Sequence, residues 1–245
     1  MFQFDPHTKS IVSSFISDES YYAGFGTRLM GNMTDASSVA QYFESIGRSY
    51  SSLYVPTQKH STNIESNIEG NQNGKLIVLE NIDGLTSKQS GALLVAWTAD
   101  CVPIIFADKK NGIVGISHSG WKGTANGMAT KMVQSLVQSG AEKESLMVAI
   151  GPSIGACCYD VDEERVAIFK SSFPSFADRI IQIRGGKNFL NLLYTNVLLL
   201  QSEGIPAGNI DWFPFCTKCD EKKFFSYRRE GESHGNMISY AMRIK

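Results

Sequence analysis

Three short apolar runs near the middle of the chain constrain its fold more than any other feature of the sequence. They cover residues 93–97, 103–107 and 113–117, and a turn at residues 110–112 separates the last two. Apolar runs of this length between turn signals are typical of strands buried in a sheet. The centre of the chain is therefore predicted to form buried β-sheet.

Periodic patterns on either side of these runs predict a mixed architecture. Apolar residues recur at helical spacing from Ala125 to Val137 and stop at Gly140, a predicted C-terminal cap. No linker or repeat divides the 245 residues, so we expect one domain over residues 1–245, of the α+β or mixed α/β class, with helices outside the sheet. Further helices are predicted through Val39, Phe43 and Ile46 behind a Thr34/Asp35 cap, over 162–170 and over 188–202, and further strands over 146–150, 210–213, 224–227 and 237–243.

The composition excludes several classes of protein. With 42% hydrophobic and 19% charged residues, the chain has material for a large core, unlike a disordered protein. Its formal net charge of −1 provides no long-range field to attract nucleic acid or an anionic membrane. No window reaches the ~18 uninterrupted apolar residues of a membrane helix. Because the N-terminus also shows no secretory signal, we expect a cytoplasmic protein that recognises a small ligand.

Cys101 and His118 are the strongest candidates for a chemical site. Each lies where a predicted buried strand meets a turn, so neighbouring strands could bring the thiol and the imidazole to one sheet edge. Together they could be a nucleophile and its base, or two ligands of zinc. The alternative is a histidine that only hydrogen-bonds at a strand end.

The turn from Gly120 to Gly123 is a candidate anion site. Backbone N–H groups at a glycine-rich helix start, with Lys122 beside them, can bind a phosphate group. The spacing does not match a P-loop, and an ordinary tight turn is the alternative interpretation.

The other four cysteines form one Cys-x-x-Cys pair, Cys216 and Cys219, and one adjacent pair, Cys157 and Cys158. In a chain without a secretory signal, thiols or metal ligands are favoured over disulfides. A structural zinc site of this type normally has a second spaced pair, which the adjacent cysteines do not provide. We therefore predict that Cys216 and Cys219 are buried structural thiols outside the metal site.

Several motifs, taken together and in order, resemble those of one enzyme family. Over residues 22–243 the chain is similar to the YfiH/LACC1 family of purine nucleoside phosphorylases, formerly called multicopper polyphenol oxidases or laccase-domain proteins. The motifs are Thr98-Ala-Asp-Cys-Val-Pro103, His118-Ser-Gly-Trp-Lys-Gly123, Ile150-Gly-Pro-Ser-Ile-Gly155 with Cys157-Cys-Tyr159, Cys216-Thr217 and Phe225-Ser-Tyr-Arg-Arg229.

The resemblance implies a single mixed α/β domain with layered sheets and outer helices, and one catalytic zinc site. The family's Gln-Val-His-Gly motif falls on Gln58-Lys-His-Ser61, so His60, Cys101 and His118 are the implied metal ligands and catalytic residues, with copper as the alternative metal. Arg28, in the segment that matches the family's Gly-Phe-Ser-Thr-Arg motif, is implied to contact the substrate, and we add Lys122 as a phosphate contact.

The implied activity is phosphorolysis of adenosine, inosine and S-methyl-5′-thioadenosine to a free base and a pentose 1-phosphate, with adenosine deaminase activity. The expected partners are a purine nucleoside and phosphate, without nucleic acid or membrane, for a monomer or homodimer. The alternatives are a peptidoglycan-editing hydrolase that removes mis-incorporated serine from a cell-wall precursor, a laccase-like phenol oxidase, and a non-catalytic zinc module. The four histidines are too few for a multicopper oxidase.

Overall fold

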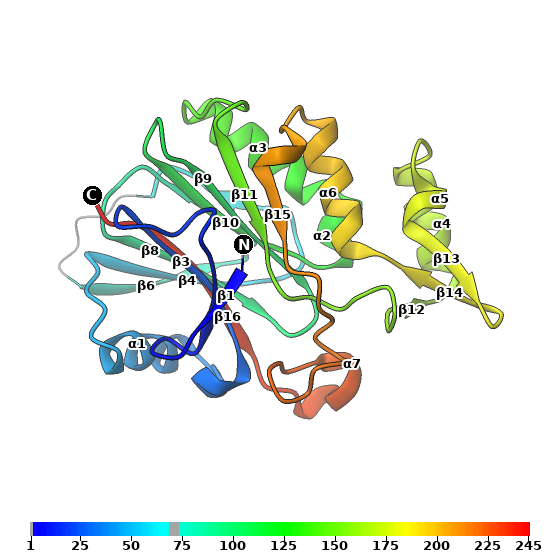
Figure 1. Ribbon diagram of the computed structural model, residues 1–245, viewed down its shortest axis with the longest axis horizontal. Coiled ribbons are helices and arrows are strands. Elements are labelled where there is room, and N and C mark those ends of the chain that lie inside the picture. Colours follow the sequence, from blue (N-terminus) through cyan, green and yellow to red (C-terminus); the bar gives the residue numbers. More distant parts are fainter. Residues whose placement is uncertain (1, 69–73) are drawn as a thin grey trace.

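The computed structural model describes residues 2–68 and 74–245, and two large sheets form its centre (Figure 1). The first sheet has seven strands in the order β1-β2-β3-β16-β8-β4-β6. These strands are β1 (Phe2–Asp5), β2 (Ser10–Ser13), β3 (Tyr21–Gly26), β16 (Met237–Arg243), β8 (Ala92–Thr98), β4 (Ser52–Thr57) and β6 (Lys75–Glu80).

The second sheet has six strands in the order β15-β11-β9-β10-β7-β5. They are β15 (Ile210–Trp212), β11 (Leu146–Ile150), β9 (Val102–Asp108), β10 (Ile113–Ser119), β7 (Gly84–Ser87) and β5 (Ile64–Glu65). A third, small sheet contains β12 (Asp160–Val161), β14 (Lys187–Leu190) and β13 (Ile181–Arg184).

Helices cover the outer faces of the two large sheets (Figure 1). Helix α1 packs on the first sheet, and α3 and α6 pack on the second. None of the helices in the described residues is both long and apolar enough to cross a membrane. The helices are α1 (Ala36–Ser45), α2 (Trp121–Ala125), α3 (Met128–Gln138), α4 (Glu163–Ser172), α5 (Ala177–Ile180), α6 (Leu192–Ser202) and α7 (Tyr227–Glu230), with short 3-10 helices η1 (Arg28–Met30), η2 (Ala207–Asn209) and η3 (Gly231–Ser233).

The apolar runs form strands that are buried on both faces. In β9, Ile105 and Ala107 contribute to the core between the two sheets, whereas Ile104 and Phe106 contribute to the core beneath α3 and α6. Successive side chains of a strand point to opposite faces, so a continuous apolar run is required when both faces are covered. This requirement explains why these runs were recognisable in the sequence.

Most predicted elements are confirmed. The strands expected over 93–97, 103–107, 113–117 and 146–150 are β8, β9, β10 and β11. The expected helix between Ala125 and Val137 is divided, because Gly127 adopts a left-handed conformation with φ of 76° between α2 and α3.

Two predictions were wrong in part or in full. The helix expected over 188–202 begins only at Leu192, because residues 187–190 pair with β13 as strand β14. The strand expected over 224–227 is absent from this described segment. The side chain of Ser226 accepts a hydrogen bond from the N–H of Arg229 and caps α7 instead.

The fold brings two connections between the sheets to one edge. Residues 99–101 pass from β8 in the first sheet to β9 in the second, and residues 58–63 pass from β4 to β5 in the same way. His118 of β10 is registered opposite Pro103 of β9 at this edge. The loops that carry Cys101 and His60 are thereby placed beside the end of β10.

Truncating Phe106 to alanine tests the core beneath α3 and α6. This ring is fully buried, so we expect Phe106→Ala to lower the free energy of unfolding by about 3–5 kcal/mol. Ile183→Ala is the control, because that side chain is 75% exposed and its loss should cost less than about 0.5 kcal/mol. Urea unfolding measures both, and equal effects would contradict the assigned core.

Candidate metal centre and active-site cavity

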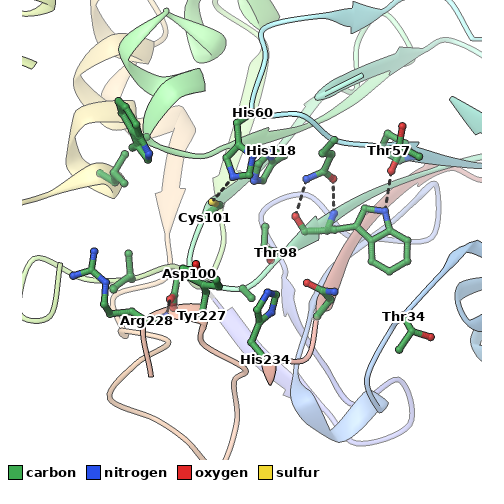
Figure 2. Close-up of a pocket in the computed structure, with 18 of the residues that line it drawn as sticks. Thr34, Thr57, His60, Thr98, Asp100, Cys101, His118, Tyr227, Arg228 and His234 are labelled. Atoms are coloured by element: carbon green, nitrogen blue, oxygen red, sulfur yellow. Dashed lines mark hydrogen bonds between the residues drawn. The ribbon is translucent and has the colours of Figure 1, made fainter. Parts of the chain in front are cut away.

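Three potential metal ligands lie together where the chain crosses between the sheets (Figure 2). Sγ of Cys101 lies 3.7 Å from Nε2 of His60. The imidazole rings of His60 and His118 meet edge to face, with their centroids 4.7 Å apart. The three ligand atoms all lie within 4.8 Å of one another. The structure thus brings together the three residues that the sequence motifs singled out.

The donor set and its spacing fit a tetrahedral metal ion. Zinc bonds of ~2.0–2.3 Å to nitrogen and sulfur place neighbouring ligand atoms roughly 3.3–3.8 Å apart. The separation of 3.7 Å between Cys101 and His60 falls within this range. Three protein ligands also leave a fourth position for water or substrate, as in catalytic sites. The geometry is therefore that of a metal site with an open position.

One buried carboxylate, that of Asp83, positions both histidines. Its Oδ1 accepts hydrogen bonds from Nδ1 of His118 at 2.8 Å and from the backbone N–H of His60 at 3.2 Å. Its Oδ2 accepts from the backbone N–H and the hydroxyl of Ser61, and from the N–H of Lys59. Because Nδ1 of His118 is engaged, Nε2 is the nitrogen available to a metal.

Cys101 and His118 hold each other in their charged forms. Burial disfavours the Cys101 thiolate, but His118 and His60 outweigh this effect and lower the pKa of the thiol to about 6. Burial likewise lowers the pKa of His118, but the Cys101 thiolate and Asp83 raise it to about 9. Burial raises the pKa of Asp83, yet hydrogen bonds from His118 and Ser61 bring it to about 2. Cys101 is therefore a thiolate at neutral pH, the form that binds metals, and His118 is an imidazolium, whose Nε2 proton a metal ion would displace.

Gly120 permits the close approach of the ligands. A Cβ atom at this position would lie 2.6 Å from Cδ2 of His60 and 3.0 Å from Sγ of Cys101. Two residues of the site also adopt left-handed backbone conformations that are unusual for side chains with a Cβ, His60 with φ of 57° and Asp100 with φ of 96°. From the sequence, Gly120 belongs to a candidate anion site or to an ordinary tight turn, and the structure adds a steric role beside the ligands.

The ligands open onto a cavity of about 880 Å³ (Figure 2). Its walls come from the ends of the first-sheet strands, from the segment between α2 and α4, and from the C-terminal segment around α7. Aromatic rings and arginine side chains line it together, a composition suited to a flat ring and an anionic group. The lining includes Trp97, Trp121, Tyr159 and Tyr227, together with Arg165, Arg228 and His234.

Asp100 ties the C-terminal wall of the cavity to the metal site. Its Oδ1 accepts from the hydroxyl of Thr217 at 2.6 Å. Its Oδ2 accepts from the hydroxyl of Ser226 at 3.0 Å and from the backbone N–H of Arg228 at 2.7 Å. Because Asp100 directly precedes Cys101, the start of α7 is fixed relative to the thiol.

Arg28 and Lys122 are not among the residues that line the cavity. The guanidinium of Arg28 donates to the backbone carbonyl of Glu221 and lies 4.6 Å from the ring centroid of Phe225. Lys122 is exposed beside Trp121. Their expected contacts with substrate and phosphate stay predictions.

Arg165 was not singled out from the sequence, but it lines the cavity. Its guanidinium carbon lies 4.4 Å from the ring centroid of Trp121 within the cavity wall. Its buried Nε has no hydrogen-bond partner among the described residues. No local pattern distinguishes Arg165 from other helix residues. Asp83 was not singled out either, because no local pattern marks it as a partner of the histidines.

The prediction for the other cysteines needs correction. Cys219 is exposed rather than buried, and Cys157, Cys158, Cys216 and Cys219 bring their sulfur atoms within 4.8 Å of one another. Cys216 is buried as predicted. Adjacent thiols can approach one point from a turn, although in a regular strand they face opposite sides, so their spacing in the sequence does not keep Cys157 and Cys158 away from the Cys-x-x-Cys pair.

A family model described as "multi-copper polyphenol oxidoreductase laccase" matches residues 33–244. The chain belongs to this family. Two solved structures share the fold of this laccase family member. YlmD from Geobacillus stearothermophilus has a TM-score of 0.86 at 28% identity and covers 100% of this chain and 99% of that chain. The Bacillus licheniformis hypothetical protein YfiH has a TM-score of 0.86 at 27% identity, and the match covers 99% of this chain and 98% of that chain. The predicted family and fold class are thus confirmed.

Two curated relatives of this laccase family member carry enzyme names. Adenosine deaminase RL5, from an unknown prokaryotic organism, is 35% identical over 162 residues, which are 66% of this chain and 62% of that protein. Purine nucleoside phosphorylase YlmD from Geobacillus stearothermophilus is 37% identical over 161 residues, which are 65% of this chain and 59% of that protein. The matched region spans less than two thirds of the length of each relative.

Replacing Asp83 with asparagine tests its control of the metal ligands. An amide nitrogen in place of one oxygen would face N–H donors, so we expect Asp83→Asn to weaken zinc binding by roughly 10–100-fold. Competition with a zinc chelator measures the affinity. Asp18→Asn is the matched control, since Asp18 also accepts two backbone N–H groups, but in a loop far along the chain. Equal zinc affinity in both variants would exclude the positioning role.

Proposed function

We propose that this chain is a zinc-dependent purine nucleoside phosphorylase that acts on adenosine, inosine and S-methyl-5′-thioadenosine, with adenosine deaminase activity. The observation that carries the proposal is the three-ligand cluster with an open position at the wall of a cavity of about 880 Å³. A cavity of this size accommodates a nucleoside together with phosphate. The names of the relatives, purine nucleoside phosphorylase and adenosine deaminase, support the same substrate class.

His60, Cys101 and His118 would hold the zinc ion, with Asp83 orienting His118. Two imidazoles and a thiolate are ligands that zinc prefers. When bound, zinc supplies Lewis-acid chemistry at an oxygen atom of water or substrate. The copper chemistry in the family's description is less well supported, because the described residues contain no second cluster of histidines.

Arg165 and Arg228 are the proposed phosphate contacts within the cavity. Arg165 has an unpartnered buried Nε among the described residues, and Asp160 accepts two hydrogen bonds from Nη1 of Arg228 and fixes its position. Guanidinium groups suit phosphate because they donate two parallel hydrogen bonds. The rings of Trp121, Tyr159 and Tyr227 line the same cavity and offer stacking surfaces for a purine.

The proposed reaction makes one bond and breaks another at the pentose. A phosphate oxygen bonds to C1′ as the bond from C1′ to the purine nitrogen breaks. The proton of hydrogen phosphate leaves with the base, so the products are a neutral purine and a pentose 1-phosphate. Two arginines beside the anion would offset the negative charge as the phosphate approaches the sugar.

Dependence on phosphate tests this function directly. We expect purified protein to release hypoxanthine from inosine only when phosphate is present, with ribose 1-phosphate as the second product by chromatography. Arsenate in place of phosphate should give free ribose, because its ester hydrolyses. Hypoxanthine released at the same rate without either anion would show a hydrolase and contradict the proposal.

The phosphate contacts are tested by comparing two cationic residues. Arg165→Gln removes one charge-assisted hydrogen bond of about 1.5–3 kcal/mol, so we expect the KM for phosphate to rise about 10-fold or more, with a smaller change for inosine. Lys122→Ala removes a charge that lies outside the cavity lining and should change this KM much less. The opposite result would support the sequence-based expectation for Lys122 and overturn the role of Arg165.

A further inference from the structure

Four thiols outside the active-site cavity converge in a way that neither the family resemblance nor the proposed activity requires. Sγ of Cys219 lies 3.4 Å from Sγ of Cys158 and 3.7 Å from Sγ of Cys157. Together with Cys216, all four sulfur atoms lie within 4.8 Å of one another. Four sulfurs around a zinc ion, at bonds of ~2.3 Å, are about 3.8 Å apart. The cluster is close to that arrangement.

The backbone around Cys216 has the geometry of a metal-binding knuckle. The N–H of Gly155 donates a hydrogen bond to Sγ of Cys216 at 3.2 Å, and the backbone N–H groups of Lys218 and Cys219 help to lower the pKa of this thiol. Backbone N–H groups beside a sulfur favour its thiolate form. The Cys-x-x-Cys turn has backbone amides beside its first sulfur, and it is therefore suited to bind a cation.

The two thiol pairs are held in register by backbone contacts. Ser153 and Cys216 form a parallel β-bridge, and the N–H of Thr217 donates to the carbonyl of Ser153 at 3.0 Å. Gly155 lets the two segments approach, because a Cβ there would lie 3.1 Å from Cβ of Cys216 and 3.2 Å from Sγ of Cys157. The segments are thus docked by bonds that do not involve the thiols.

We propose that Cys157, Cys158, Cys216 and Cys219 bind a second zinc ion in a four-thiolate structural site. Four protein ligands close the coordination sphere and leave no position for substrate. The proposal raises the expected stoichiometry from one zinc ion per chain to two. It is independent of the proposed phosphorylase activity.

This site would brace the C-terminal wall of the cavity. Nη1 of Arg229 donates to the carbonyls of Thr217 and Lys218 within the knuckle, at 3.0 and 2.9 Å. The hydroxyl of Thr217 donates to Asp100, which also accepts from the N–H of Arg228. An ion that fixes the 216–219 turn would therefore also fix the start of α7, where Tyr227 and Arg228 line the cavity.

Disulfide formation is the competing chemistry, since Cys158 and Cys219 are close enough to bond after a small movement. Two disulfides would need an oxidant and would leave no thiol for a metal. The hydrogen bond from the N–H of Gly155 to Sγ of Cys216 favours the metal site, because an amide donor stabilises a thiolate more than a neutral disulfide. The experiment must therefore measure both metal content and free thiols.

The Cys101→Ala variant isolates the second site, because it removes a ligand of the first and leaves the four-cysteine cluster intact. We expect this variant, purified under reducing conditions, to retain one zinc ion per chain by elemental analysis. Its four remaining thiols should resist alkylation until a chelator is added. Replacement of zinc by cobalt should give the intense thiolate-to-metal absorption of a tetrahedral thiolate site.

Two further variants complete the test. Adding Cys216→Ser and Cys219→Ser to Cys101→Ala should remove the remaining zinc, whereas adding Lys218→Ala, which keeps all four thiols and the knuckle, should not. Absence of metal from Cys101→Ala, with thiols that react freely or are paired as disulfides by mass spectrometry, would overturn the proposal. The cobalt spectrum of Cys101→Ala decides the question even if the cysteine-to-serine variants do not fold.

Discussion

The buried carboxylate of Asp83 is the interaction on which the arrangement of the metal site depends. It is 2% exposed, and it joins the 59–61 segment to His118 through both of its oxygen atoms. The backbone carbonyl of the same residue also accepts from the N–H of His118. A buried charge without such partners would cost several kcal/mol. The loop that carries His60 is therefore positioned by the same contacts that satisfy this carboxylate.

Asp100 has the corresponding role on the opposite wall. It is also buried, and its three hydrogen-bond donors come from the C-terminal segment more than a hundred residues away. The residue after it supplies the thiolate of the metal cluster. Movement of α7 would thus disturb Cys101, and the proposed four-cysteine site would limit such movement. The cavity is shaped by two buried carboxylates: Asp83 joins the segments that carry His60 and His118, and Asp100 joins the residue before Cys101 to the C-terminal segment.

The family is described as a laccase, yet a relative such as YlmD is named as a nucleoside enzyme. Both descriptions refer to proteins of one fold. The solved structures of YlmD and YfiH share this fold almost over their whole length at 27–28% identity. A shared fold does not fix an activity, which depends on the residues of the site. In this chain the site combines two histidines, one thiolate and two cavity-lining arginines. The proposed function is built on that combination, with an anionic co-substrate beside the metal ion instead of a multi-copper centre.

The sequence by itself determined the central strands and the residues of the metal cluster. Strands β8 to β11 could be predicted because burial on both faces requires continuous apolar runs, a property of neighbouring residues. His60, Cys101 and His118 were found through motifs, as was Arg28, whereas Lys122 was singled out from the glycine-rich turn beside it. Only the tertiary structure decided that Asp83 and Arg165 belong to the site, that residues 224–227 cap a helix, and that four cysteines meet. These features depend on loops that distant strands bring together, and the distance between such loops is set by the packing of the two sheets rather than by any local pattern.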